Sequence, residues 1–241
     1  MVLVCLFIIL FLIVASLILH ETGHLLAAKL IGLPIERFTL GVGKPLFKKK
    51  IGGLDLAIAP LPFGASVTHK TEDIKKLKWG PHMLFLVSGC LMNFIFGYIL
   101  ILIALSHRDN PFILTSEYII NLLSGLMNNI ILLFSGQLSI QSGNISEGFS
   151  NIAIAASSVS TDIFMQIKAS MLIGGYMSII LGIGNLLPIP SLDGGQMITE
   201  SLIRIGNRKG HNFRPVINKI NNFCFLGMMI GMLFLFIFDL L

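Results

Sequence analysis

Apolar residues gather in four long stretches of the chain, and polar residues separate these stretches. They lie at residues 1–30, 83–105, 169–190 and 222–240. A membrane-spanning helix needs about 20 apolar residues, with a range of roughly 17 to 25, and the last stretch is marginal in length. The pattern predicts an all-α polytopic membrane protein with four transmembrane helices.

A cleaved signal peptide is the rival interpretation of the first stretch. No basic segment opens it, and no small-residue cleavage site precedes its histidines. It is also longer than the apolar region of a signal peptide, which has roughly 7–15 residues. We therefore favour a membrane span.

Glycines and prolines punctuate residues 38–68, directly after the first predicted span. Prolines exclude a continuous helix there, and Leu54–Ile58 has the short apolar alternation of a strand. A plain loop is the alternative, but we favour a small membrane-associated β-hairpin.

Residues 107–167 separate the second and third predicted spans. Within them, 118–134 is apolar but carries asparagines at positions 121, 128 and 129. An extra crossing here would place the basic segment 204–219 outside, against the usual charge bias. We interpret 118–134 as an amphipathic or interfacial helix, followed by a Ser/Gly/Asn-rich connection near 135–150. The whole chain, 1–241, is then a single membrane-embedded domain.

The net charge of +5 is distributed unevenly along the chain. Lysine and arginine crowd the first and third connections between the predicted spans, while residues 107–167 carry few of them. Basic connections usually stay in the cytoplasm, which predicts that both termini are extracytoplasmic. Because the charges follow topology and no aromatic–basic platform accompanies them, nucleic acid is not an expected partner. Cys5, Cys90 and Cys224 lie singly in predicted spans and are expected to be small buried hydrophobes.

Residues 20–24 read H-E-x-x-H inside the first apolar stretch. On a helix, positions i and i+4 share a face, so His20 and His24 can both turn toward one ion. Zinc in hydrolytic sites takes three protein ligands and keeps one position open, where Glu21 can reach a water as general base. A packed histidine pair is the alternative. Ionisable groups at membrane depth, however, cost roughly 2.5–3.5 kcal/mol and usually mark function.

Asp193 is the candidate third ligand, in the sequence NLLPIPSLDGG at 185–195. Prolines end the preceding helix there, and the glycines after Asp193 permit sharp turns. Broken backbone at membrane depth is tolerated where it is buried or lines a wet cavity. The predicted topology places His24 and Asp193 at a similar depth. The other histidines, at 69, 82, 107 and 211, are expected to be solvated.

These two motifs resemble those of the site-2 proteases, membrane-embedded zinc metalloproteases that cut other transmembrane segments. The resemblance implies that His20, His24 and Asp193 bind Zn²⁺ and that Glu21 is the general base. Within that family the chain is most similar to the bacterial regulator of sigma-E protease group. Location in the bacterial inner membrane is thereby implied, with single-span membrane proteins such as anti-sigma factors or remnant signal peptides as substrates.

The chain departs from the family in its second core helix and between its second and third spans. Cys90 stands where relatives usually have proline, although Asn93 still matches. Asn93 and Asn185 are candidates for positioning the substrate, with a buried asparagine bonded to a neighbouring helix and a helix cap as the alternatives. A PDZ domain is usual between the second and third spans, but about 60 residues are too few to hold one.

The expected function is therefore hydrolysis of peptide bonds in or near transmembrane segments. Three alternatives remain: a membrane zinc peptidase with a glutamate as third ligand, for which Glu200 is the candidate; an inactive relative that binds membrane proteins; and, more weakly, a metal transporter. The intact Glu21 argues against an inactive relative, because such a protein has no need of that carboxylate.

Overall fold

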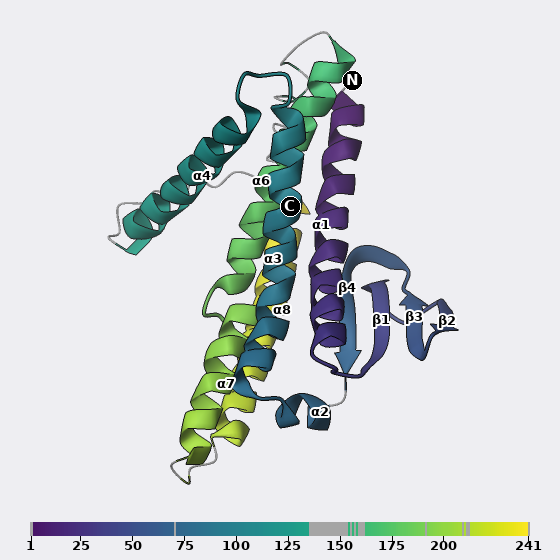
Figure 1. The fold of residues 1–241 in the computed structure, drawn as a ribbon, viewed down its shortest axis with the longest axis vertical. Coiled ribbons are helices and arrows are strands. Elements are labelled where there is room, and N and C mark those ends of the chain that lie inside the picture. Colours follow the sequence, from purple (N-terminus) through teal and green to yellow (C-terminus); the bar gives the residue numbers. More distant parts are fainter. Residues whose placement is uncertain are drawn as a thin grey trace. The chain divides into compact units, whose positions relative to one another are not determined.

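The computed structural model describes residues 2–69, 71–134, 154, 156, 158, 162–190, 192–208, 210 and 213–240 (Figure 1). The predicted connection near 135–150 lies outside this range. Helices fill most of the described chain: α1 (Val2–Leu30), α2 (Thr71–Lys76), α3 (Trp79–Ala104), α4 (Pro111–Phe134), α6 (Ile163–Leu186), α7 (Asp193–Arg208) and α8 (Arg214–Leu240).

Three of the described helices are long and apolar enough to cross a membrane: α1, α3 and α6. They correspond to the first three predicted spans. The predicted fourth span falls within α8 and remains a prediction, as does the orientation of the termini. A helix over 118–134 is confirmed as the greater part of α4, while its place in the membrane stays a prediction.

The region expected to hold a β-hairpin forms a four-stranded mixed sheet instead. Its strands are β1 (Ile35–Val42), β2 (Phe47–Ile51), β3 (Leu54–Ile58) and β4 (Leu61–His69), in the spatial order β2-β3-β1-β4. β2 and β3 are the antiparallel hairpin, turning at Gly52 and Gly53, which both have positive φ. β1 pairs parallel with β3 and antiparallel with β4.

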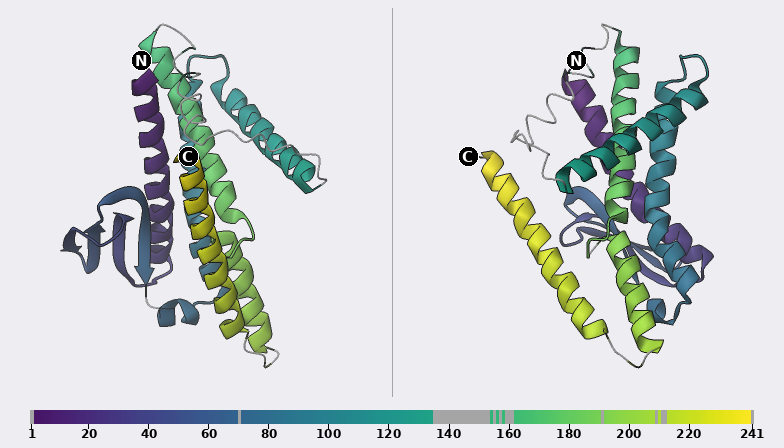
Figure 2. Two further views of the ribbon diagram at one scale, coloured as in Figure 1. Left: turned by 180° about the vertical axis from the view of Figure 1, so that it is seen from behind. Right: turned by 90° about the vertical axis from the view of Figure 1, so that its left-hand side faces the viewer.

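The predicted hairpin has fewer strands than the observed sheet because the prediction rested on Leu54–Ile58 and a glycine turn, which do not indicate β1 or β4. Pro62 lies in β4, a strand at the edge of the sheet. An edge strand tolerates proline, since one side of its backbone needs no ladder partner. Pro62 is therefore compatible with its place in β4. In Figures 1 and 2, β4 is the strand nearest to α1.

The chain divides into two compact units, each containing parts of α1, α3 and α6. One unit comprises Met1–Ile13 and Ile95–Ile179. Its helices approach closely at small residues: a Cβ on Gly174 would lie 2.6 Å from Leu12 Cδ1, and one on Gly175 would lie 2.7 Å from Ile101 Cγ1. Small residues at such contacts are how membrane helices pack without a hydrophobic driving force.

The other unit comprises Val14–Phe94 and Ile180–Leu241, and it contains every candidate site residue. A cluster around Ala28, Leu33 and Phe85 forms its buried core. Gly23 brings α1 against α3, because a Cβ there would lie 2.4 Å from the Ser88 carbonyl oxygen. That close contact fixes the histidine-bearing part of α1 against α3.

Candidate metal centre

His20 and His24 come from one face of α1, as their spacing predicts. Each is only 6% exposed, and their Nε2 atoms lie 3.2 Å apart. Gly89 of α3 makes room for both rings, since a Cβ there would lie 2.6 Å from each Nε2. The two imidazoles therefore occupy space that any other residue at position 89 would take.

Groups on α3 orient both imidazoles. His24 Nδ1 lies 2.7 Å from the Phe85 carbonyl oxygen, which can only accept, so Nδ1–H donates and Nε2 is left bare. The Asn93 amide lies 3.3 Å from His20 Nδ1. In the structure the amide nitrogen Nδ2 faces this nitrogen. Turning the amide over, which exchanges its oxygen and nitrogen, would let it accept the Nδ1 proton and leave the second Nε2 bare as well. Such partners on the far ring nitrogen are typical of metal-binding histidines.

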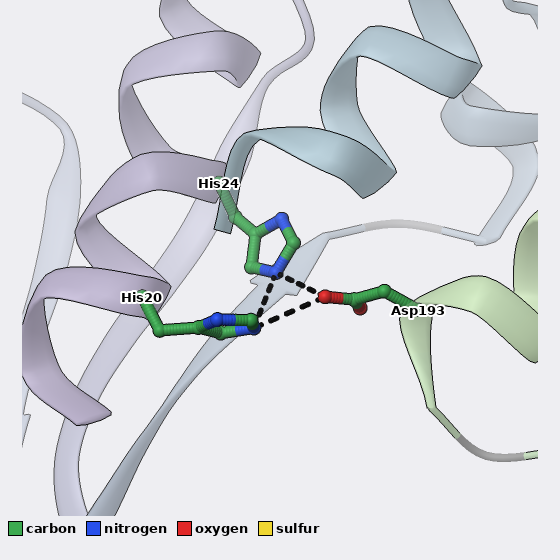
Figure 3. A group of neighbouring side chains, drawn as sticks. All are labelled: His20, His24 and Asp193. Atoms are coloured by element: carbon green, nitrogen blue, oxygen red, sulfur yellow. Dashed lines mark hydrogen bonds and ion pairs between the residues drawn. The ribbon is translucent and has the colours of Figure 1, made fainter. Parts of the chain in front are cut away.

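Asp193 reaches the histidines from the first residue of α7 (Figure 3). Its Oδ2 lies 3.0 Å from His20 Nε2 and 3.4 Å from His24 Nε2. One oxygen of the carboxylate thus faces both Nε2 atoms and is placed to act as a third ligand.

The glycines after Asp193 allow α7 to begin close to the end of α6. A Cβ on Gly194 would lie 2.1 Å from the Leu186 carbonyl oxygen, and one on Gly195 would lie 2.0 Å from that of Ile189. Any other residue would clash with backbone at both positions. The D-G-G sequence is therefore what the tight entry into α7 requires.

The three side chains fit a divalent metal such as zinc. His20, His24 and Asp193 are buried, and each offers a ligand atom within 4.8 Å of the others. Ligand atoms 2.0–2.2 Å from a tetrahedral ion lie about 3.3–3.6 Å from one another. The observed separations of 3.0, 3.2 and 3.4 Å come close to one face of such a tetrahedron. Two neutral imidazoles and one carboxylate are also a usual donor set for hydrolytic zinc.

Glu21 lines the same cavity as these three residues. The cavity has a volume of about 300 Å³ and is lined by His20, Glu21, His24, Ser66, Val67, His69, Phe85, Leu86, Asn185, Asp193 and Gln196. Val67, Ser66 and His69 of β4 line the cavity together with Glu21. Strand β4 thus forms one wall of the cavity, whereas helices form the other walls.

The two predicted substrate-positioning asparagines lie in different places. Asn93 is fully buried against His20 and is not among the residues that line the cavity. The geometry thus favours the alternative interpretation, a buried asparagine bonded to a neighbouring helix. Asn185 does line the cavity, and its Nδ2 donates to the Leu181 carbonyl within α6.

His69 and His82 were predicted to be solvated, and for both residues the prediction was wrong. His69 lines the cavity, its ring stacks on Phe85, and its Nε2 is buried without a hydrogen-bond partner in the described part of the chain. His82 is buried and lies beside Arg204. The signal for His69 would have been the register of β4, a strand that the sequence analysis did not predict.

The prediction of buried cysteines is confirmed for Cys5 and Cys90. Cys90 has an unexpected neighbour: its Sγ lies 3.7 Å from Asp193 Oδ2, toward which the thiol donates. Glu200, the alternative third ligand, forms an ion pair with Arg214 at 3.4 Å and is not part of the His–His–Asp group.

Comparison with protein families gives one match over most of the chain. The family described as Peptidase family M50 matches residues 7–231.

Several proteins share local similarity with the chain. "Putative zinc metalloprotease" of Chlamydia pneumoniae is 48% identical over 50 residues, covering 21% of this chain and 8% of that protein. "Putative zinc metalloprotease CPE1693" of Clostridium perfringens is 31% identical over 94 residues, covering 36% and 28%. "Probable membrane metalloprotease ARASP2, chloroplastic" of Arabidopsis thaliana is 29% identical over 99 residues, covering 36% and 22%. The matched stretches therefore span less than a third of each relative.

Proposed function

This chain belongs to peptidase family M50, the family of the site-2 proteases that its two motifs resemble, and on that premise we propose that it is an intramembrane zinc metalloendopeptidase. In this proposal His20, His24 and Asp193 hold the ion and Glu21 is the general base. The observation that carries it is the approach of the three donor atoms to within 3.0–3.4 Å of one another, with Glu21 in the same cavity.

A bound zinc ion would supply Lewis-acid polarisation of the scissile carbonyl and acidify a water molecule. The chain supplies the proton transfers. Glu21 takes a proton from the attacking water as its oxygen bonds to the carbonyl carbon, then delivers that proton to the departing amide nitrogen as the C–N bond breaks.

Residues around the three proposed ligands would hold the ligand side chains in a fixed orientation during the reaction. The Phe85 carbonyl holds the ring of His24, and the Asn93 amide holds that of His20. The thiol of Cys90 donates to Asp193. Because all these groups belong to α1, α3 and α7, the ligand geometry rests on packed helices rather than on loops.

A substrate segment must be extended before its carbonyls can enter the cavity, because a helix uses them internally. β4 ends the sheet and lines the cavity through Ser66, Val67 and His69. An extended peptide beside β4 would gain main-chain hydrogen bonds without depending on its own sequence. This mode suits substrates that share a transmembrane segment but little sequence, such as anti-sigma factors or remnant signal peptides in a bacterial inner membrane.

The proposal is tested with a purified single-span model substrate, tagged at both ends and reconstituted with the protein in detergent or bilayers. Glu21→Gln should slow cleavage by at least about 100-fold, the share a general base supplies, and should keep zinc bound. The exposed carboxylate of Glu117 on α4 gives the matched control, and Glu117→Gln should cleave normally. Unchanged turnover by Glu21→Gln would remove the proposed base. Binding of the substrate without any cleavage by the unmodified protein would instead favour a non-enzymatic role.

A further inference from the structure

A second cavity, which we call the basic pocket, lies apart from the metal centre and has a different chemistry. It has a volume of about 720 Å³, and its lining comes from the start of α3 and the last turns of α7: Lys78, Trp79, Ser201, Arg204, Ile205, Asn207 and Arg208. Both segments belong to the unit that holds the metal centre. None of the seven side chains is used in the proposed hydrolysis.

All the charged residues that line the basic pocket are positive. Lys78, Arg204 and Arg208 line it, and no carboxylate does. The nearest acidic residue on α7, Glu200, is occupied by Arg214. Three cations that share a concave surface without counter-charges form a site for an anion.

Arg204 is held in place at the pocket wall. Its Nη2 donates to the Leu77 carbonyl at 2.8 Å and lies 3.3 Å from Nδ1 of the buried His82. Its Nε is buried with no hydrogen-bond partner in the part of the chain that the structure describes. A guanidinium held in one orientation at the wall of a pocket is suited to pairing with the oxygen atoms of a phosphate.

An apolar stripe runs along α7 beside these cations. Ile198, Leu202 and Ile205 follow the spacing i, i+4, i+7 of one helix face, and each is 47–51% exposed. Ile205 belongs to both the stripe and the pocket. A helix that exposes an apolar face flanked by arginines is typical of the membrane interface, where the apolar side enters the acyl region.

Trp79 places the basic pocket at the level of lipid headgroups. It is the first residue of the candidate span α3, it is 56% exposed, and its Nε1–H donates to Ser201 Oγ at 3.1 Å. Tryptophan is enriched where a span meets the headgroups. The hydrogen bond also ties the start of α3 to α7, so the two walls of the pocket form one surface.

We propose that the basic pocket binds an anionic phospholipid, with the phosphate between Lys78, Arg204 and Arg208 and an acyl chain along Ile198, Leu202 and Ile205. The cations of the pocket would pair with the lipid phosphate, and the apolar stripe would contact the acyl chain. A free phosphate has no acyl chain and would leave the stripe uncovered. The proposal does not depend on the hydrolytic function, because it rests on residues outside the metal centre.

Trp79 is the only tryptophan in the chain, so intrinsic fluorescence reports directly on this pocket. The 241-residue chain is reconstituted in phosphatidylcholine nanodiscs containing rising fractions of phosphatidylglycerol brominated on its acyl chains. Quenching should saturate at a low fraction of the brominated anionic lipid and exceed that caused by brominated phosphatidylcholine at the same fraction. Equal quenching by the two lipids would overturn the proposal.

Variants separate a built site from general attraction to a charged surface. Lys78→Gln/Arg208→Gln should raise the half-saturating fraction about tenfold or more, given that each basic residue near an anionic surface contributes about 1 kcal/mol. Arg204 is left intact because its bonds to Leu77 and His82 support the fold. Lys48→Gln/Lys49→Gln removes the same charge from exposed β2 and should leave the curve unchanged. An equal shift in both variants would overturn the proposal.

A final arm distinguishes a lipid from its headgroup alone. Soluble glycerol phosphate, added to neutral nanodiscs, should neither change Trp79 emission nor compete with the brominated lipid at millimolar concentration. Competition at that concentration would assign the pocket to a small phosphate compound instead. Circular dichroism and zinc content should be the same for all variants, which ensures that each protein is folded when its curve is measured.

Discussion

Gly89→Ala is the sharpest test of the metal centre, because a single methyl group would enter the space of two ligands. The new Cβ would lie 2.6 Å from Nε2 of both His20 and His24, whereas ordinary contacts begin near 3.4 Å. Each imidazole must therefore move by about 0.8 Å or rotate away. Metal–ligand distances tolerate only about ±0.2 Å. We expect zinc affinity to fall about 100-fold or more, beyond the 10–100-fold that loss of an outer partner alone produces.

The same substitution should have little effect on folding. The clashing atoms are the ends of side chains that can rotate, and alanine is favoured over glycine inside a helix by roughly 0.8–1.0 kcal/mol. Loss of zinc without loss of structure is thus the expected signature.

Gly80→Ala provides the matched control on the same helix, because a Cβ at that position meets nothing within 4 Å. Both variants are purified in detergent, dialysed against a competing chelator of known zinc affinity and measured for zinc content and circular dichroism. Gly80→Ala should bind zinc like the unmodified protein. If Gly89→Ala also retains full affinity, the Nε2 atoms of His20 and His24 do not hold the metal and the proposed centre is wrong.

Three further predictions follow from contacts in the same unit. Asn93→Ala should weaken zinc binding about 10–100-fold in the chelator competition, whereas a role confined to substrate would leave it unchanged. His69→Ala should retain zinc but reduce cleavage of the model substrate, because the ring lines the cavity beside the ligands; equal cleavage would exclude a substrate contact. Burial lowers the pKa of His69 below its ordinary 6.5, so the unfolded chain binds this proton more readily and stability should fall as pH drops below about 6.5. His69→Gln should reduce that loss when melting temperatures at pH 7.5 and 5.5 are compared; an unchanged difference would contradict it.

The grouping of His20, His24 and Asp193 could be predicted because its signals are local in sequence. H-E-x-x-H places His20 and His24 on one face of any helix, and the prolines and glycines around Asp193 mark a break that a buried carboxylate can use. The structure adds what no spacing contains: which groups of α3 stand behind the histidines. Gly89 and the Phe85 carbonyl gain their roles only when α1 and α3 pack, and Cys90 gains its contact with Asp193 only when α7 packs against α3.

The sheet was harder to predict because its pairing is not sequential. β1 pairs with β3 and β4, and its neighbour in sequence, β2, lies at the far edge. The local alternation near Leu54–Ile58 indicates a hairpin, but it carries no information about β1 and β4, which lie outside that hairpin. Without β4, His69 has no reason to lie near the metal centre, so its assignment as a solvated histidine followed directly from the missing strand.

The lysines of β2 have a consequence for self-association. Lys48, Lys49 and Lys50 are all exposed on that strand, and charge repulsion between copies discourages a second molecule from extending the sheet there. Strand β4 itself, with the sequence LPFGASVTH, contains no comparable run of charged residues. An additional strand would therefore pair more readily at the β4 edge of the sheet, which lines the cavity that contains Glu21. Under the proposed function, in which the sheet accepts extended substrate segments, the same charges would protect the protein against polymerising through its own strands.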